Sequence, residues 1–240
     1  FDDLIVGTVS EASRDSISVS SFAVSGSDFS GAATQVGTTA ADTLSGTAAR
    51  DVLVGGTGGD TLVGAGGTDV IYGGAGDDVI SVADLTFERV AGGNGTDTLK
   101  LAGTGLTLDL AAIDAPSLTG IERIDLTGGN SLVLNRLEVL NLSDHSNTLR
   151  VLGAAADKVT LQDTNWAPGL AVTDSGVTFD VYTNGNARLE IQQGAVVKKP
   201  FGPIELSALE LNSDARGFVI NGVSAGNRPG VSVSSAGDVN

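Results

Sequence analysis

The sequence predicts an all-β protein whose centre is a parallel β-roll, a β-solenoid in which the chain coils through short strands. Two observations carry this prediction. Aspartates recur every nine residues through a stretch that holds 17 of the chain's 34 glycines. Farther along, short segments alternate aliphatic and polar residues, which is typical of half-buried strands. Glycine at this density indicates many tight turns with positive φ rather than a flexible linker.

The nine-residue period defines five consecutive units. In each unit an aspartate is followed two positions later by an aliphatic residue, and these aspartates are Asp42, Asp51, Asp60, Asp69 and Asp78. A sixth unit, GGNGTDTLK (92–100), places Asp97 nineteen residues after Asp78, so the segment 82–91 is expected to replace one turn with a degenerate one. Six glycine-rich residues of a unit should form a turn, and the next three a short strand whose middle aliphatic residue points inward.

Two units should complete one coil, so that units two apart stack and their aspartates form columns. One column would hold Asp42, Asp60 and Asp78, and the other Asp51 and Asp69. Stacked carboxylates repel one another, so a cation is expected between the layers. Carboxylates and turn carbonyls offer only oxygen ligands, which suits Ca²⁺ before Mg²⁺. A glycine-rich β-solenoid without metal is the alternative.

These units resemble the RTX nonapeptide family, whose consensus GGxGxDxUx forms a calcium-loaded parallel β-roll. Residues 55–63, 73–81 and 92–100 match the consensus in full. Units 37–45 and 46–54 lose most turn glycines, so they are expected to form a capping entry with weak or absent metal, and Ala65 replaces the second glycine of its unit. The resemblance implies several Ca²⁺ ions, held by Asp42, Asp51, Asp60, Asp69, Asp78, Asp97, Gly55, Gly73 and Gly92.

The segment 106–199 should continue the strands as a metal-poor β-solenoid or a sandwich. Its short alternating runs are broken by Gly, Asn or Asp. Asn184-Gly185 between two such runs predicts a β-hairpin. Residues 135–140 could instead form one helical turn. The run KKPFGP (198–203) is the best candidate for a domain boundary, so the expected organisation is 1–36, 37–105, 106–199 and 200–240.

The two ends of the sequence resemble complementary halves of an FG-GAP (integrin-type) repeat. Residues 217–240 are similar to its first part, and FDDLIVG (1–7) is similar to the strand that follows its calcium loop, D-x-N-x-D-G-x-x-D. The expected architecture therefore includes a small antiparallel FG-GAP-like element at the chain ends.

The same resemblance implies a further set of metal ligands. Asp238 and Asn240 match the first two ligands of the loop, Phe1 would supply a backbone carbonyl, and Asp3 the final carboxylate. Three residues, expected as Gly-Asp-Gly, are missing between Asn240 and Phe1. The chain is then either one period of a tandem array cut inside its loop, which the complementary halves favour, or a fragment whose ends both fall in related motifs.

Little in the sequence indicates catalysis, and no enzyme activity is expected. His145 is the only histidine, no G-x-S-x-G motif is present, and there is no cysteine. Asp144 beside His145 is more simply explained by a solvated loop than by a catalytic pair. Asp77-Asp78 is more simply explained by ligand or rim roles than by acid–base catalysis. Trp166 is expected to pack in the local core rather than to stack on a carbohydrate. A net charge of −16 disfavours nucleic acid, and no apolar run approaches the length of a membrane span.

The resemblances together imply a calcium-dependent structural repeat unit of a large secreted bacterial surface protein, exported as type I secretion substrates are. Such a unit would act in an adhesin-like stalk or an extracellular filament, with other copies of itself as partners and surface glycans as a further possible ligand. Two alternatives stay open. One is an RTX export and folding module of a secreted hydrolase, and the other is a glycan-binding adhesive module.

Overall fold

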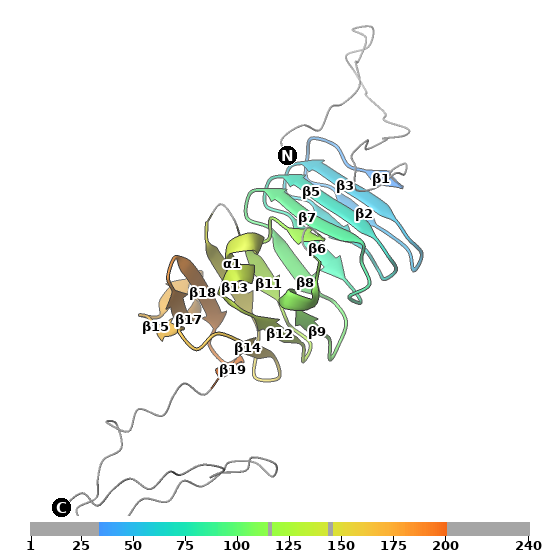
Figure 1. Ribbon diagram of the computed structural model, residues 1–240. Coiled ribbons are helices and arrows are strands. Elements are labelled where there is room, and N and C mark those ends of the chain that lie inside the picture. Colours follow the sequence, from blue (N-terminus) through green and yellow to red (C-terminus); the bar gives the residue numbers. More distant parts are fainter. Residues whose placement is uncertain (1–33, 115–116, 144–145, 201–240) are drawn as a thin grey trace, which may run out of the picture. The chain divides into compact units, whose positions relative to one another are not determined.

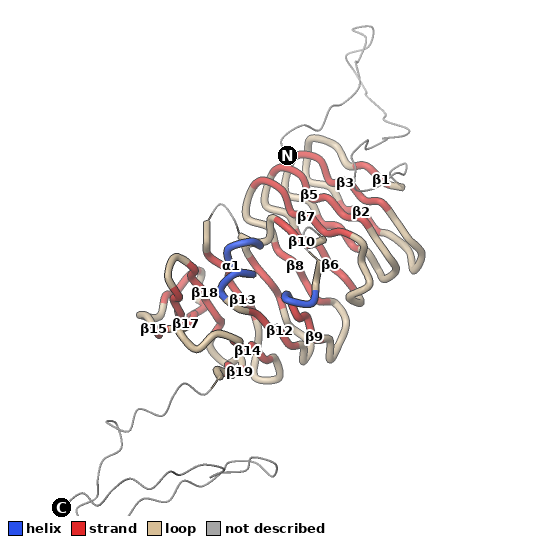
Figure 2. Tube along the Cα trace, in the orientation of Figure 1, coloured by secondary structure: helices blue, strands red, loops and turns tan. Residues whose placement is uncertain are grey.

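A computed structural model describes residues 34–114, 117–143 and 146–200, all within one unit of the chain that ends at Gly202. The predicted FG-GAP-like segments lie almost entirely outside these residues. The described part is built from strands that run through three sheets, with one short α-helix and one 3₁₀ helix (Figures 1 and 2). This confirms the predicted all-β class.

Most of the strands belong to parallel ladders. The first sheet contains β1 (Gln35–Val36), β3 (Val52–Thr57), β5 (Val70–Ala75), β7 (Arg89–Asn94) and β10 (Leu118–Thr119). The parallel part of the second sheet contains β2 (Thr43–Ser45), β4 (Thr61–Val63), β6 (Val79–Val82), β8 (Thr98–Leu101), β11 (Arg123–Asp125), β13 (Thr148–Leu152) and β18 (Ala187–Gln192). The third sheet contains β9 (Thr107–Asp109), β12 (Ser131–Leu134), β14 (Lys158–Leu161) and β19 (Val196–Lys198).

The nine-residue units form a two-sided roll, as predicted. Strands β3 and β5 pair in parallel with Val52 opposite Val70, and β2 pairs with β4 with Thr43 opposite Thr61, so one coil takes two units. The next coil is one residue longer, because Val79 lies opposite Thr98. The extra residue falls in the turn before β7, which confirms that the segment 82–91 contains an irregular turn.

From β8 onward each coil gains a third side. Strands β9, β12, β14 and β19 form this side as a separate parallel sheet. On the first side, the helix α1 (Arg136–Leu142) follows β10, and the N–H of Ile121 donates to the carbonyl of Leu142 at the end of this helix. The middle segment is therefore a continuation of the solenoid and not a sandwich.

Aliphatic side chains stack in rows along the inside of the coils. One row on the second sheet consists of Leu44, Leu62, Ile80, Leu99 and Ile124. All but Leu44 are completely buried, and Leu44 in the first coil is 9% exposed. Burial of an aliphatic side chain contributes about 1.5–3 kcal/mol. These rows explain why every unit needs an aliphatic residue two positions after its aspartate.

Two local predictions for the middle segment are confirmed. β17 (Val177–Asn184) and β18 form an antiparallel hairpin, but its two-residue turn is Gly185-Asn186, one position later than the predicted pair, and Gly185 has a φ of 59°. The helix α1 begins after Asn135, whose side chain and that of Glu138 form a capping box. The capping box explains why this segment leaves the strand pattern.

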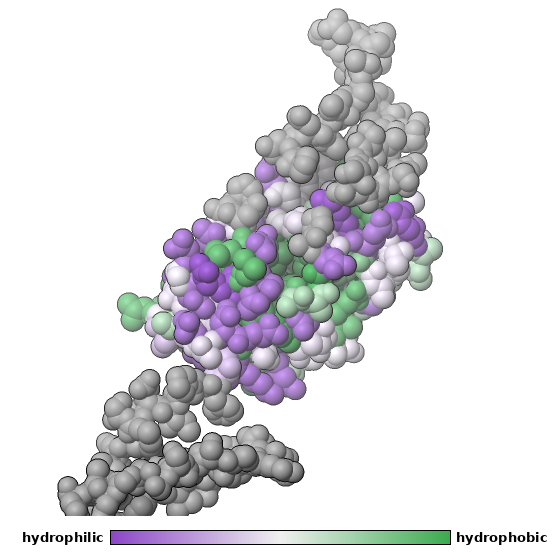
Figure 3. Space-filling view, viewed as in Figure 1, coloured by the Kyte–Doolittle hydropathy of each residue, from purple (hydrophilic) through white to green (hydrophobic). Residues whose placement is uncertain are grey.

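An antiparallel excursion packs against the end of the second sheet. This excursion consists of β15 (Ala167–Pro168), β16 (Val172–Asp174) and β17. The 3₁₀ helix η1 (Leu110–Ala112) is not part of it and directly follows β9. In the view of Figure 3, hydrophilic residues cover most of this part of the surface, with small hydrophobic patches between them.

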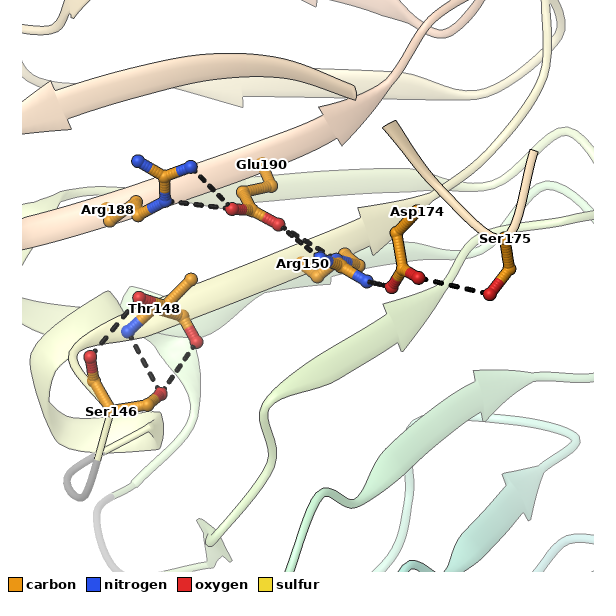
Figure 4. Close-up of polar contacts among 7 residues, drawn as sticks. All are labelled: Ser146, Thr148, Arg150, Asp174, Ser175, Arg188 and Glu190. Atoms are coloured by element: carbon orange, nitrogen blue, oxygen red, sulfur yellow. Dashed lines mark hydrogen bonds and ion pairs between the residues drawn. The ribbon is translucent and has the colours of Figure 1, made fainter. Parts of the chain in front are cut away.

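Charged side chains join this excursion to the parallel strands (Figure 4). Glu190 accepts from Arg150 at 2.7 Å and from Arg188 at 2.8 Å, and Arg150 also pairs with Asp174. The guanidinium of Arg150 lies 4.6 Å from the centre of the Phe179 ring. The network is satisfied by its own members, which explains how Glu190 is tolerated at 5% exposure.

The corner that precedes the third sheet is held together by a buried amide. Asn130 is completely buried, and its Nδ2 donates to the carbonyls of Leu101 at 3.2 Å and Gly103 at 3.0 Å. Its Oδ1 accepts from the N–H of Leu106 at 2.8 Å, and its own N–H donates to Asp157 at 3.0 Å. This corner therefore satisfies its backbone groups with protein atoms alone.

We expect Asn130→Ala to lower the free energy of unfolding by about 3 kcal/mol, because it leaves buried backbone groups without partners. Urea denaturation at saturating Ca²⁺ measures this change. Asn141→Ala is the matched control, since Asn141 is exposed on α1 and its replacement should change the stability by less than about 0.5 kcal/mol. Equal effects of the two substitutions would contradict the assigned role of Asn130.

Candidate metal centre

The predicted aspartates form two columns at opposite edges of the roll. The column at the start of the second sheet contains Asp42, Asp60, Asp78 and Asp97, and we call it column A. The column at the start of the first sheet contains Asp51 and Asp69, and we call it column B. All of these aspartates except Asp42 are buried. Short strands fix them at the last position of each turn.

In column A, one oxygen of each carboxylate from Asp60 onward holds the layer before it. The N–H of Asp42 donates to Oδ1 of Asp60 at 2.8 Å, that of Asp60 to Oδ1 of Asp78 at 2.7 Å, and that of Asp78 to Oδ1 of Asp97 at 2.8 Å. Each aspartate thus bonds to the backbone of its neighbour, and the column becomes a continuous ladder.

From Asp60 onward, the second oxygen of these carboxylates has no partner among the described residues. Oδ2 of Asp60, Asp78 and Asp97 is buried and makes no hydrogen bond to any described residue. A buried, unpaired carboxylate oxygen is costly, because burial removes water without providing another donor. These three atoms therefore mark positions where a bound cation would restore the lost interaction.

Glycines that the sequence predicts in turns, but that lie in β3 and β5, complete the place for such a cation. A methyl group added to Gly55 would lie within 3.0 Å of both the carbonyl oxygen of Gly73 and Oδ2 of Asp60. The same holds at Gly73 for the carbonyl of Gly92 and Oδ2 of Asp78. Because glycine has no side chain there, a carboxylate oxygen and a carbonyl oxygen from the next layer converge on the same space. Two or more hard oxygens at each layer are the ligands that Ca²⁺ prefers.

The first unit of each column differs from the units that follow. Oδ2 of Asp42 accepts from the N–H of Thr38 at 2.6 Å and from its hydroxyl at 2.8 Å. Oδ2 of Asp51 accepts from Thr47 in the same way, at 2.6 Å and 2.9 Å. Threonine occupies the second turn position, where full repeats have glycine, and satisfies the carboxylate itself. This arrangement agrees with the expected capping entry, although the metal content of these turns stays a prediction.

Column B ends differently from column A. The N–H of Asp51 donates to Oδ1 of Asp69 at 2.9 Å. In the next layer of the column, Glu88 occupies the position that corresponds to Asp69. Glu88 pairs with Arg50 at 2.9 Å, so an arginine spans the outside of this column. Burial raises the pKa of Asp69, and the charges of Asp51 and Asp84 raise it further. The hydrogen bond from the N–H of Asp51 and the charge of Arg50 lower this pKa only in part.

Burial raises the pKa of the deepest carboxylates in column A. Desolvation is the largest cause for both Asp78 and Asp97, and neighbouring carboxylates raise the pKa values further. For Asp97 the pKa reaches about 7, with Asp78, Glu122 and Asp77 as the contributing charges. Column A thus carries carboxylates that resist ionisation unless a positive charge lies beside them.

Sequence reasoning missed two carboxylates that extend the columns. Glu122 lies opposite Asp97 in the next coil, and its Oε2 accepts from the N–H of Asp97 at 2.9 Å. Glu88 takes the corresponding place after Asp69. Both are followed two positions later by a buried aliphatic residue, Ile124 and Val90. A search that allowed glutamate in the aspartate position, without a fixed period, would have found them.

The other predicted residues have simpler outcomes. Oδ1 of Asp77 accepts from the N–H of Thr96 at 2.8 Å at the exposed rim of the roll. Ala65 has a φ of 61°, which is the left-handed conformation that glycine would adopt without strain. Trp166 is 4% exposed and packs in the core, as predicted, so it is not available to stack on a carbohydrate.

Several predicted positions lie outside the described residues. They are the catalytic alternative Asp144 and His145 and the FG-GAP-like ligands Phe1, Asp3, Asp238 and Asn240. Within the described ranges, no three carboxylates or histidines gather around one point. The columns supply one carboxylate for each layer, so carbonyl oxygens must provide the remaining protein ligands.

Comparison with known proteins agrees with this geometry. Residues 36–71 and 54–83 match the family of RTX calcium-binding nonapeptide repeats (4 copies). Residues 36–83 contain RTX repeats. These repeats bind Ca²⁺ ions in several turns, and they are typical of secreted bacterial proteins. The matched RTX segment ends before the unit 92–100, although the structure places Asp97 in the same column. No curated protein matches the chain.

The metal-free RTX roll should become more stable as the pH falls from about 7 toward 4. In the folded state the pKa of Asp97 is about 7 rather than 3.8, so the folded chain binds this proton more tightly than the unfolded chain does. The stabilisation is present at low pH and is lost as the pH rises through 7. Far-UV circular dichroism in EDTA at pH 7.5 and pH 5.5 measures it as a larger folded fraction at pH 5.5, and Asp97→Asn should reduce the difference. A folded fraction that does not rise at pH 5.5 would contradict the role of Asp97.

Proposed function

We propose that the chain is a calcium-dependent structural repeat unit of a large secreted bacterial surface protein. It would act as part of an adhesin-like stalk or an extracellular filament, outside the cell, and would carry no catalytic activity of its own. The observation that carries the proposal is the row of buried carboxylate oxygens without partners in column A. A chain that buries such oxygens has a fold that depends on the cation.

Asp60, Asp78 and Asp97 would hold the ions in column A, together with the carbonyl oxygens of the glycine turns. Asp69 would contribute in column B, whereas Asp42 and Asp51 already have threonine partners. Bound Ca²⁺ supplies positive charge that offsets the repulsion between layers. The chain's own residues supply the rigid frame, because each carboxylate also holds the backbone of the adjacent coil.

Calcium would then control where the chain folds. The net charge is −16, and the metal-free chain repels itself and loses much entropy when its glycines are ordered. An ion that binds only the folded state adds about 2.7 kcal/mol for each site at a hundredfold excess over Kd. Several such sites favour an extended, secretable chain at low cytoplasmic calcium and a folded unit outside the cell.

The architecture also supports a structural role. Parallel coils stack by repeated backbone pairing, so that each coil contacts its neighbours and the stack grows in one direction. Units would join head to tail through the FG-GAP-like halves at 1–7 and 217–240, a proposal supported by the sequence alone. No helix in the described part of the chain is long and apolar enough to cross a membrane.

Calcium titration followed by far-UV circular dichroism tests the proposal. We expect β-sheet signal to rise with Ca²⁺ and to require much more Mg²⁺, since Mg²⁺ demands stricter octahedral geometry. Asp78→Asn should raise the calcium midpoint by about tenfold or more. Its control is Asp77→Asn, which removes the same charge at the exposed rim and should leave the midpoint almost unchanged. A fully folded spectrum in excess EDTA would exclude the proposed mechanism.

A further inference from the structure

The first coil of the roll ends in two strands with free edges. β1 is the first strand of the first sheet and β2 the first strand of the second sheet, so each pairs on one side only within the described residues (Figure 1). A free edge exposes backbone N–H and C=O groups to which another strand can bond, and proteins therefore cover or block such edges. The side chains at this edge thus decide whether the stack of coils can continue.

Gln35 occupies the position of a core residue in this coil. Backbone register places Gln35 opposite Leu53 and Leu53 opposite Ile71 in the parallel ladder of the first sheet, and Val90 follows in the next coil. Leu53, Ile71 and Val90 are completely buried, whereas Gln35 is partly exposed at the open end of the row. An amide at such a position is tolerated only where its polar atoms find hydrogen-bond partners.

The amide of Gln35 reaches across the coil to the edge of the second sheet. Its Nε2 donates to the carbonyl oxygen of Ser45 at 2.5 Å, and its Oε1 accepts from the N–H of Ser45 at 3.1 Å. On its paired side, β2 bonds to β4 through the carbonyl of Asp42 and the N–H that follows β2 at Gly46. Since the backbone groups of successive residues point alternately to the two sides of a strand, those of Ser45 lie on the free edge. Gln35 therefore bonds to Ser45 as the backbone of another strand would.

Thr34 ends the ladder of the first sheet in a similar way. Its hydroxyl donates to the carbonyl oxygen of Val52 at 2.9 Å and accepts from the N–H of Val52 at 2.8 Å. The N–H of Thr34 also donates to that carbonyl, at 2.8 Å. A side chain thus bonds to both backbone groups of Val52 where β1 begins, so two neighbouring residues use their side chains to finish the same end of the roll.

The opposite end of the second sheet is closed in a different way. β17 folds back on β18 as an antiparallel strand, and β15 and β16 pair with the other edge of β17. Within the described residues, no strand takes the corresponding place beside β2. The free edge of β2 is bonded instead to a single side chain, so the closure of this end depends on Gln35.

We propose that Gln35 is a cap that closes the free edge of β2 and prevents a second copy of the chain from pairing with it. Without the cap, β2 would offer the N–H and carbonyl of Ser45, beside Leu44 at 9% exposure, to another edge strand. The cap goes beyond the proposed function, because it concerns where the stack of coils ends and not which ion it binds. Units of a stalk or filament would therefore be joined by contacts other than continued sheets at this end.

Amide exchange followed by NMR at saturating Ca²⁺ tests the cap directly. The amide of Ser45 should be protected in the unchanged chain, and Gln35→Ala should make it exchange about tenfold faster or more, because its hydrogen-bond acceptor is gone. The amide of Gly46 donates to Val63 and should keep its protection in the variant. Gln162→Ala is the matched control, since Gln162 is exposed after β14 and its replacement should leave the exchange of Ser45 unchanged.

Analytical ultracentrifugation over a range of concentrations tests what the cap prevents. Gln35→Leu extends the aliphatic row and frees both groups of Ser45, so we expect it to self-associate about tenfold more tightly than the unchanged chain. Gln35→Glu also loses the donor but places a charge at the edge, so it should associate no more tightly than the unchanged chain.

Two results would overturn the cap. One is an unchanged exchange rate of Ser45 in Gln35→Ala, and the other is equal association of Gln35→Leu and the unchanged chain. The exchange measurement keeps the test decisive if Gln35→Leu folds poorly. Failure of the unchanged chain to bind Ca²⁺ would instead overturn the proposed function.

Discussion

The stacking of carboxylates inside a protein is the constraint on which the roll depends. From Asp60 onward, each aspartate in column A has one oxygen that holds the neighbouring coil and one that is buried without a partner among the described residues. The first oxygen makes the ladder regular, and the second makes it incomplete without a cation. In the proposed function, Ca²⁺ binding and coil stacking are therefore the same event, because the groups that position the layers would also bind the ion.

Glycine and the aliphatic residues follow from this constraint. A side chain at Gly73 would collide with the carboxylate of its own unit and the carbonyl of the next layer. The aliphatic residue two positions after each aspartate fills the core of the coil. The nine-residue unit thus contains a candidate ligand, the space for an ion and a core residue, and these three requirements account for its strict period.

In the second half of the described chain, buried polar groups at a corner of the coil are paired with a side-chain amide. At the third corner, the amide of Asn130 donates to two carbonyl oxygens and accepts from a backbone N–H. An amide carries donors as well as an acceptor, whereas a carboxylate carries acceptors only. This difference explains how one solenoid can continue from a calcium-dependent part into a part that needs no cation at that corner.

The regular part of the fold could be predicted from the sequence, because a strict period fixes which residues share a layer. Asp60 and Asp78, eighteen residues apart, could be placed in one column from their spacing alone. Glu122 could not, since it follows Asp97 by 25 residues and its turn has lost the glycine pattern. The third sheet was also beyond prediction, because its strands return at unequal intervals and α1 takes the place of a strand through a capping box.

Hydrogen exchange in the presence and absence of Ca²⁺ tests the division between the two parts most directly. With Ca²⁺, the amides of β3–β8 and of β12 and β14 should both be protected. After addition of EDTA, we predict that β3–β8 lose protection first and by the larger factor, whereas β12 and β14 beside Asn130 retain more of theirs. Unchanged protection of β3–β8 in EDTA, or an equal loss in both parts, would contradict a calcium-dependent roll joined to a metal-independent solenoid.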